Sequence, residues 1–171
     1  MKGRERPSSQ ARRGRKGHPV AAETPHGAIT TLLEGAVVRS VGRAADMGVI
    51  EFAGPAGEKV MVHVQCPFRI THEGKTVLGS ADMRYAQKGA GATAFDEFRT
   101  VYDARAATLD GVLGQLRPTV DAVTVGEAGE FTVTWAPGFR LAVFPDCSGA
   151  MEAWRVLVPG GAHHGFPQDA V

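Results

Sequence analysis

Hydrophobic and polar residues alternate most regularly between Lys59 and Ile70. The apolar positions of this stretch are Val60, Val62, Val64 and Cys66. A period of two is typical of a β-strand with one buried face, so we expect these side chains to point into the core. Pro67 has no backbone N–H and should interrupt the strand before residues 68–70 resume the alternation.

Similar alternation on both sides of this stretch predicts two antiparallel meanders. In the first half, the expected strands are residues 36–41, 49–53 and 59–66, with a hairpin of residues 68–70 and 76–78. In the second half, they are residues 120–125, 131–135 and 140–147. Residues 59–66 align without gaps with residues 140–147, and Phe68-Arg69-Ile70 matches Trp154-Arg155-Val156. This correspondence indicates an internal duplication.

The segment between the two meanders has helical periodicity from Thr93 to Arg117. Its apolar stripe consists of Phe95, Phe98, Tyr102, Leu109, Val112, Leu113 and Leu116. Thr93 and Asp96 have the spacing of a capping box, and Pro118 should end the helix. Arg105 falls within the stripe. Its guanidinium is expected either to reach solvent, with the aliphatic stem on the core, or to form a buried ion pair.

These elements predict an α+β fold, in which one main helix lies between the two meanders in sequence and packs on the sheet. The pattern leaves open whether one or two sheets form. We expect a single domain over residues 28–171, preceded by a disordered basic tail over residues 1–27 that lacks hydrophobic periodicity. Residues 29–35 fit either a short helix closed by Gly35 or the lead-in to the first strand.

Charge is distributed unevenly along the chain. Residues 1–28 hold seven basic and two acidic residues, whereas the remainder holds 12 basic and 16 acidic residues. A basic tail of this kind can bind phosphate backbones, so nucleic-acid binding through the tail is one alternative function. The other interpretation of the tail is a solubilising extension. No apolar run of about 18 residues is present, so we expect no membrane span or secretion signal, and a cytoplasmic location.

The two cysteines are expected to be reduced and to face inward on equivalent strands. His63 and Cys66 lie three positions apart on a strand and therefore point to opposite faces, so no metal site is expected. The motifs of phosphate-binding loops, dinucleotide sites, zinc proteases and nucleophile elbows are missing, and no cofactor is expected. A small enzyme remains an alternative if the fold brings Cys147 close to His163 or His164.

The polar loop that begins at Gly79 is the strongest candidate for a binding site. Ser80 and Asp82 either bind a partner or cap a turn through local hydrogen bonds. Arg84 and Tyr85 are residue types that often anchor interfaces. Arg69 and Arg155 occupy matching positions in the two halves. They are expected either to be ordinary solvated side chains or to anchor an acidic partner.

Five segments carry a resemblance: VHVQCPFRI, LGSADMRY, FRLAVFPDCSG, EAWR and HHGFP. Together they resemble a set of small uncharacterised bacterial proteins from GC-rich genomes, similar in size and layout to the immunity proteins that neutralise toxins of rival cells. The resemblance covers residues 38–167 and carries over no catalytic or binding residue. The missing catalytic motifs and the polar loop after Gly79 predict a non-catalytic cytosolic protein that binds a protein partner, and the likeness to immunity proteins is an analogy of size and layout.

Overall fold

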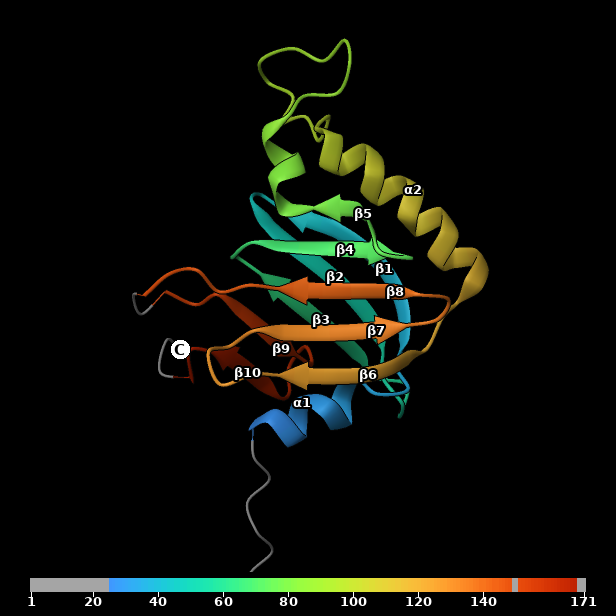
Figure 1. The fold of residues 1–171 in the computed structure, drawn as a ribbon, viewed down its shortest axis with the longest axis vertical. Helices are drawn as coiled ribbons and strands as arrows, with labels where there is room; N and C mark the ends of the chain where they lie inside the picture. Colours follow the sequence, from blue (N-terminus) through green and yellow to red (C-terminus); the bar gives the residue numbers. More distant parts are fainter. Residues whose placement is uncertain (1–24, 149–150, 169–171) are drawn as a thin grey trace, which may run out of the picture.

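The computed structural model describes residues 25–148 and 151–168, and within these ranges ten strands form two antiparallel sheets of five strands each (Figure 1). The elements of the first half are α1 (Pro25–Leu33), β1 (Val37–Ala44), β2 (Met47–Ala53), β3 (Lys59–Val64), β4 (Phe68–His72), β5 (Lys75–Gly79) and the 3-10 helix η1 (Ser80–Arg84). Those of the second half are α2 (Val101–Leu116), β6 (Val120–Val125), β7 (Phe131–Trp135), β8 (Phe139–Val143), β9 (Trp154–Leu157) and β10 (His163–Phe166). The expected α+β class is confirmed, and the open question of sheet number is answered: there are two.

The two halves exchange their last two strands. Sheet A has the order β1-β2-β3-β9-β10 and sheet B the order β5-β4-β8-β7-β6. Each meander therefore receives a hairpin from the other half of the chain: β9 pairs with β3, and β4 pairs with β8. If β1–β5 are matched in order to β6–β10, the two sheets have the same strand order, which agrees with the expected duplication.

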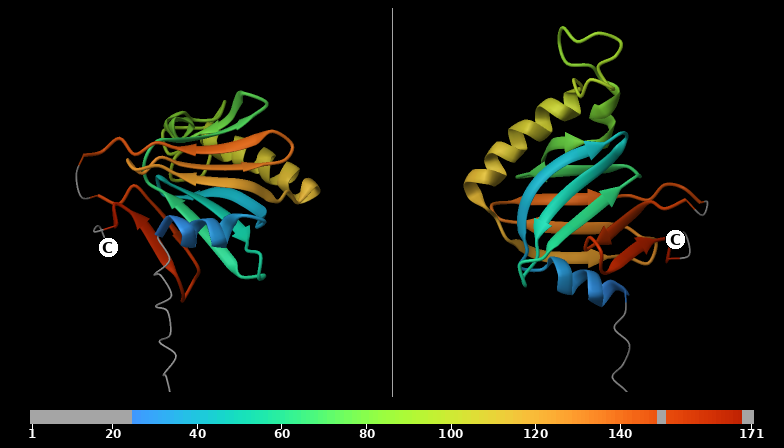
Figure 2. Two further views of the ribbon diagram at one scale, coloured as in Figure 1. Left: turned by 60° about the horizontal axis from the view of Figure 1, so that its bottom comes forward. Right: turned by 180° about the vertical axis from the view of Figure 1, so that it is seen from behind.

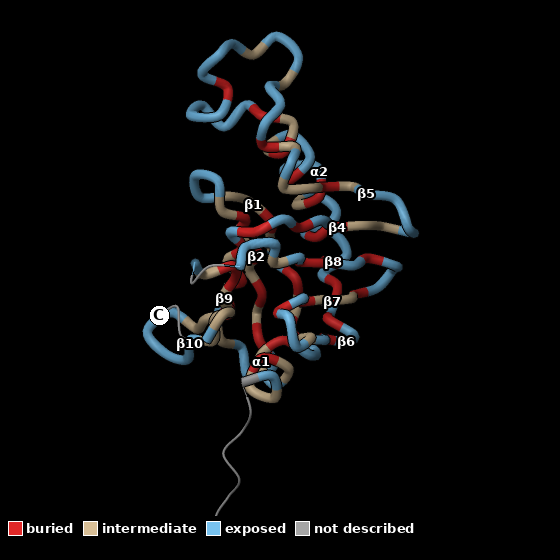
Figure 3. Tube along the Cα trace, turned by 60° about the vertical axis from the view of Figure 1, so that its left-hand side comes forward, coloured by how far each residue is buried: buried red, intermediate tan, exposed pale blue. Residues whose placement is uncertain are grey.

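The sheets pack face to face, and the core lies between them (Figures 2 and 3). The expected core residues Val60, Val62, Val64, Leu141 and Val143 are all at most 1% exposed, which confirms the register inferred from the alternation. Aromatic rings join the two layers. The ring of Trp154 in sheet A stacks on Phe131 in sheet B with centroids 5.1 Å apart, and its Nε1 donates to the carbonyl of Gly129 at 2.6 Å.

The helices cover the edges where the two sheets meet (Figure 2). Helix α2 packs on β1 of sheet A and β5 of sheet B, and α1 packs on β6 of sheet B. Two polar contacts fix α2 on β1: the Tyr102 hydroxyl donates to the carbonyl of Gly42 at 2.8 Å, and Asp110 accepts from the N–H of Val41 at 2.7 Å. Ile29 and Leu33 anchor α1 in the core.

Helix α2 begins at Val101, eight residues later than the expected start at Thr93. Thr100 and Asp103 form the capping box that we assigned to Thr93 and Asp96. The spacing Thr-x-x-Asp occurs at both Thr93 and Thr100. The aspartate of the second pair, Asp103, also accepts a hydrogen bond from the buried Arg43 at 2.7 Å, which favours the later start. Phe95 and Phe98 therefore lie outside the helix and are partly exposed, contrary to the expected stripe.

Other boundaries also differ from expectation. Residues 29–33 belong to a helix, which Gly35 follows, but α1 begins at Pro25, ahead of the expected domain start at residue 28. Strand β8 ends at Val143, so Cys147 lies beyond the strand and is exposed, whereas Cys66 is buried as expected. The prediction that both cysteines face inward is thus wrong for Cys147. Pro145 lies between Val143 and Cys147 and cannot continue a ladder.

The expected disordered tail over residues 1–27 falls almost entirely outside the described residues. Within the described part, no helix is both long and apolar enough to cross a membrane.

Candidate functional site

Two of the candidate site residues, Ser80 and Asp82, have local structural roles. The Ser80 hydroxyl accepts a hydrogen bond from the N–H of Phe68 at 3.1 Å. Asp82 accepts from the N–H of Gly79 at 2.9 Å and pairs with Arg105 on α2, also at 2.9 Å. These bonds hold η1 against β4 and α2, which agrees with the turn-capping interpretation.

The next two candidates, Arg84 and Tyr85, are exposed, and the Tyr85 side chain is 62% exposed. Arg84 forms no ion pair with any residue that the structure describes. The backbone of Tyr85 takes part in the hydrogen bonding of the fold, since its carbonyl accepts from the N–H of Val101 at 2.7 Å. The fold therefore positions the main chain rigidly here and leaves both side chains available.

Ser80 and Arg84 line a groove of about 630 Å³ at the end of the sandwich near the turn between β1 and β2. We call it the loop-end groove. It is lined by Asp46, residues 65–67, Ser80, Ala81, Met83 and Arg84 of η1, Phe95 and Asp146. Five separate segments of the chain thus meet at one surface. The loop after η1, which supplies Phe95, is mostly exposed (Figure 3).

Three charged side chains of the loop-end groove have no ion-pair partner in the part of the chain that the structure describes. Among the described residues, neither Asp46 nor Asp146 takes part in an ion pair or a side-chain hydrogen bond, and the same holds for Arg84. Sequence reasoning missed both carboxylates. Asp46 lies in the β1–β2 turn and Asp146 follows β8, so only the assembled fold brings them to one groove. The one available signal was the place of Asp46 in the turn between two expected strands, whereas Asp146 fell within the strand expected over residues 140–147.

Phe95, which lines this groove, and the exposed Phe98 are both held in place by a buried arginine. The guanidinium carbon of Arg43 lies 4.4 Å from the ring centroid of Phe95 and 4.3 Å from that of Phe98. The Arg43 side chain is only 1% exposed and is paired with Asp103. Phe95 and Phe98 remain 36% and 55% exposed, so they are ordered aromatic surfaces available for contact.

The thiol of Cys66 also lines the groove, but it is a poor nucleophile. Burial, together with the negative charge of Asp146, raises its pKa to about 11. At neutral pH this group is a protonated thiol, and the thiolate is the reactive form.

Arg69 and Arg155 lie on the outer faces of different sheets, so they do not form one patch. Arg69 projects from β4, and its guanidinium carbon lies 5.3 Å from the ring centroid of Phe144. Arg155 projects from β9, donates to Nδ1 of His63 at 3.3 Å and pairs with Glu152 at 3.2 Å. Arg69 lies near the loop-end groove, because the N–H of Phe144 donates to the carbonyl of Pro67, a groove residue, at 2.8 Å.

A second polar cluster surrounds Arg155 on the outer face of sheet A. Nε2 of His163 lies 3.9 Å from Glu152, and His63 and His163 line one shallow groove with Arg155. Burial and the neighbouring Arg155 lower the pKa of His63. His63 is therefore neutral at pH 7, and Nδ1 accepts the Arg155 hydrogen bond.

The alternative enzyme site required Cys147 beside His163 or His164. Cys147 is exposed in the segment after β8 and does not line the groove of His163. His164 pairs in the ladder with Val156. Within the part of the chain that the structure describes, no three residues among His, Cys, Asp and Glu are placed to hold a metal ion.

Comparisons with protein-family models, with curated proteins and with solved structures find no match to this chain.

Proposed function

We propose that the chain is a non-catalytic binding protein that docks a protein partner in the loop-end groove. One observation carries the proposal: the carboxylates of Asp46 and Asp146 and the guanidinium of Arg84, which have no ion-pair partner among the described residues, line one groove with the exposed ring of Phe95. Charged groups left without internal partners on an ordered concave surface favour a complementary ligand.

The charges indicate the kind of partner. Two carboxylates and one guanidinium leave an excess of negative charge, so the partner should present a lysine or arginine side chain beside an apolar one. The cation would lie between Asp46 and Asp146, and the apolar group would pack on Phe95. Residues 29–171 carry a net charge of −4, which favours approach of a basic surface. Tyr85 and Arg69 would add contacts at the rim.

This mode of action fits a cytosolic immunity protein, which neutralises a toxin by covering its surface. A toxin gene beside the gene for this chain would support that form of the proposal.

The test is affinity capture from the native cell, quantified by mass spectrometry. Wild type is compared with an Asp46→Asn/Asp146→Asn variant and an Arg84→Ala/Tyr85→Ala variant. Asp121→Asn is the matched control, because it removes an exposed carboxylate from β6, outside the groove. We expect a partner that wild type and Asp121→Asn retain and that both groove variants lose at least tenfold.

A Cys147→Ser variant separates binding from catalysis. We expect it to capture the partner and to retain the biological effect. If Cys147→Ser alone abolished that effect while the fold stayed intact, the binding proposal would be replaced by an enzymatic one.

A second candidate function, nucleic-acid binding, rests on the seven basic residues within residues 1–28. Deletion of the tail would then remove most binding to a DNA or RNA duplex and flatten its salt dependence. Equal binding with and without the tail would exclude this function for the tail.

A further inference from the structure

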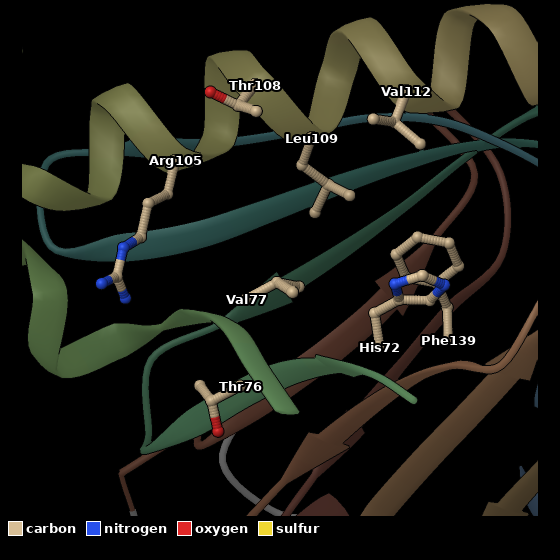
Figure 4. Close-up of a pocket in the computed structure, with 8 residues that line it drawn as sticks. All are labelled: His72, Thr76, Val77, Arg105, Thr108, Leu109, Val112 and Phe139. Carbon is tan, nitrogen blue, oxygen red and sulfur yellow. The ribbon is translucent and has the colours of Figure 1, made fainter. Parts of the chain in front are cut away.

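A second groove runs between α2 and the β4–β5 hairpin and shares no lining residue with the loop-end groove (Figure 4). Its volume of about 450 Å³ lies within the range of roughly 300–1,000 Å³ that small-molecule sites occupy. We call it the α2 groove. Its apolar walls are Leu109 and Val112 on the helix and Val77 on β5, and Figure 4 shows these side chains converging on the space between the two elements.

The two ends of the α2 groove differ chemically. One end carries the guanidinium of Arg105, and the other is closed by the ring of His72 stacked on Phe139, with centroids 4.1 Å apart (Figure 4). Arg105 and Val112 are seven residues apart on α2, which corresponds to about 10 Å along the helix axis. The groove is therefore elongated, with a cationic end and an aromatic end.

Arg105 retains free hydrogen-bond donors. Its side chain is 47% exposed, and among the described residues its one side-chain hydrogen bond runs from Nη1 to Asp82. A guanidinium has five N–H donors, so Nε and Nη2 can still bind a second carboxylate.

We infer that the α2 groove binds a small amphipathic monocarboxylate. Its carboxylate pairs with Arg105, its apolar chain lies on Val77 and Leu109, and an aromatic or aliphatic end group packs against the His72–Phe139 stack. The charge of Arg105 favours a carboxylate at one end of the ligand, and the apolar walls favour a hydrocarbon chain for the rest of it. A neutral analogue of the same shape loses the charge-assisted hydrogen bonds and binds more weakly. This site is independent of the loop-end groove.

The test uses the full chain and two probes, 4-phenylbutanoate and octanoate, followed by ¹H–¹⁵N NMR titration. We expect saturable shift changes at the amides of Val77, Leu109 and Val112. The neutral analogue 4-phenylbutan-1-ol should bind at least fivefold more weakly than 4-phenylbutanoate.

Variants locate the binding within the groove. Arg105→Gln should weaken 4-phenylbutanoate at least fivefold, whereas Arg99→Gln, which removes an arginine that is 50% exposed outside the groove, should not. Thr76→Trp fills the groove from an exposed position of β5 and should abolish binding, and Thr124→Trp at an exposed position of β6 is its control. The amide spectrum of each variant reports its fold. If both carboxylates fail to give saturable shifts, or if folded Arg105→Gln and Thr76→Trp bind as wild type does, the site does not exist as inferred.

Discussion

Val37 and Thr119 form an isolated antiparallel bridge with each other, and each directly precedes a Val-x-x-Val segment, residues 38–41 in the first half of the chain and residues 120–123 in the second. The surrounding hydrogen bonds are symmetric. The N–H of Val38 donates to the carbonyl of Pro118 at 2.9 Å, and the N–H of Val120 donates to the carbonyl of Ala36 at 2.8 Å. Equivalent segments that meet in antiparallel fashion define a local two-fold axis. This local symmetry agrees with the expected internal duplication at the point where the two halves touch.

The exchange of hairpins predicts that neither half folds alone. Fragments 1–90 and 91–171 each lack the hairpin that completes their own sheet, since β9 and β10 belong to sheet A and β4 and β5 to sheet B. We expect each fragment to be unfolded or self-associated, and an equimolar mixture to recover the native circular dichroism spectrum and the mass of a single chain by light scattering. A stable folded monomer of either fragment would contradict this account.

Helix α1 is expected to stabilise the domain, whereas the residues before it are not. Removal of residues 1–24 should leave the melting temperature nearly unchanged. Removal of residues 1–33 also deletes Ile29 and Leu33, which are at most 1% exposed, and burial of each contributes about 1.5–3 kcal/mol. Thermal unfolding of both truncated chains measures the difference. Equal stability of the two would show that α1 is not part of the folded unit.

Asp103 is expected to make the fold sensitive to acid. Burial alone would raise its pKa, but hydrogen bonds from Arg43 and Thr100 outweigh burial and hold the pKa below its ordinary value. A carboxylate with a lowered folded-state pKa contributes stability above its unfolded value, about 3.9, and loses it as the pH falls through the folded value. Asp103→Asn should therefore cost on the order of 3 kcal/mol at pH 7, because it leaves Arg43 buried without its charge partner.

The loss caused by Asp103→Asn should shrink below about pH 4. Urea unfolding between pH 2.5 and pH 7 measures this dependence. Asp110→Asn is the control with the opposite sign, since burial raises the pKa of Asp110 despite its hydrogen bond from the N–H of Val41. A loss for Asp103→Asn that stays constant with pH would mean that the Arg43 pair does not lower the pKa of Asp103.

The strands were predictable from sequence because their buried faces repeat at every second residue, as at Val60, Val62 and Val64. The start of α2 was not, because Thr93 and Asp96 match the capping pattern as well as Thr100 and Asp103 do. What separates the two is Arg43, which is far away in sequence and binds Asp103 and the two phenylalanine rings. Contacts between residues so far apart in sequence produce no periodic pattern around the start of the helix.

The candidate site was predictable only in part. Arg84 belongs to a polar loop that the sequence itself marks, and the structure places it in the loop-end groove. Asp46 and Asp146 lie 100 residues apart and meet only in the assembled fold. In the sequence, Asp46 is not distinguishable from an ordinary acidic turn residue, and Asp146 was expected inside a strand.

The two cysteines should differ strongly in reactivity. With a pKa of about 11, the buried thiol of Cys66 contains little thiolate at pH 7.5, whereas Cys147 is exposed. Iodoacetamide should modify Cys147 much faster than Cys66 in the native protein, and both at similar rates in urea. Mass spectrometry of the peptides that contain Cys66 and Cys147 measures the extent of modification at each thiol over time. Rapid native modification of Cys66 would show that its thiol is activated, which would favour a catalytic role for the groove.

The central claim is that the carboxylates of the loop-end groove bind a basic segment of a protein partner, and isothermal titration with the purified partner tests it most directly. We expect Asp46→Asn/Asp146→Asn to weaken the dissociation constant at least tenfold, about 1.4 kcal/mol, and Asp121→Asn to leave it within about twofold. Added salt should weaken wild type more than the double variant, because screening acts on the removed charges. Equal affinity of the double variant and wild type, with the same salt dependence, would contradict the proposed function.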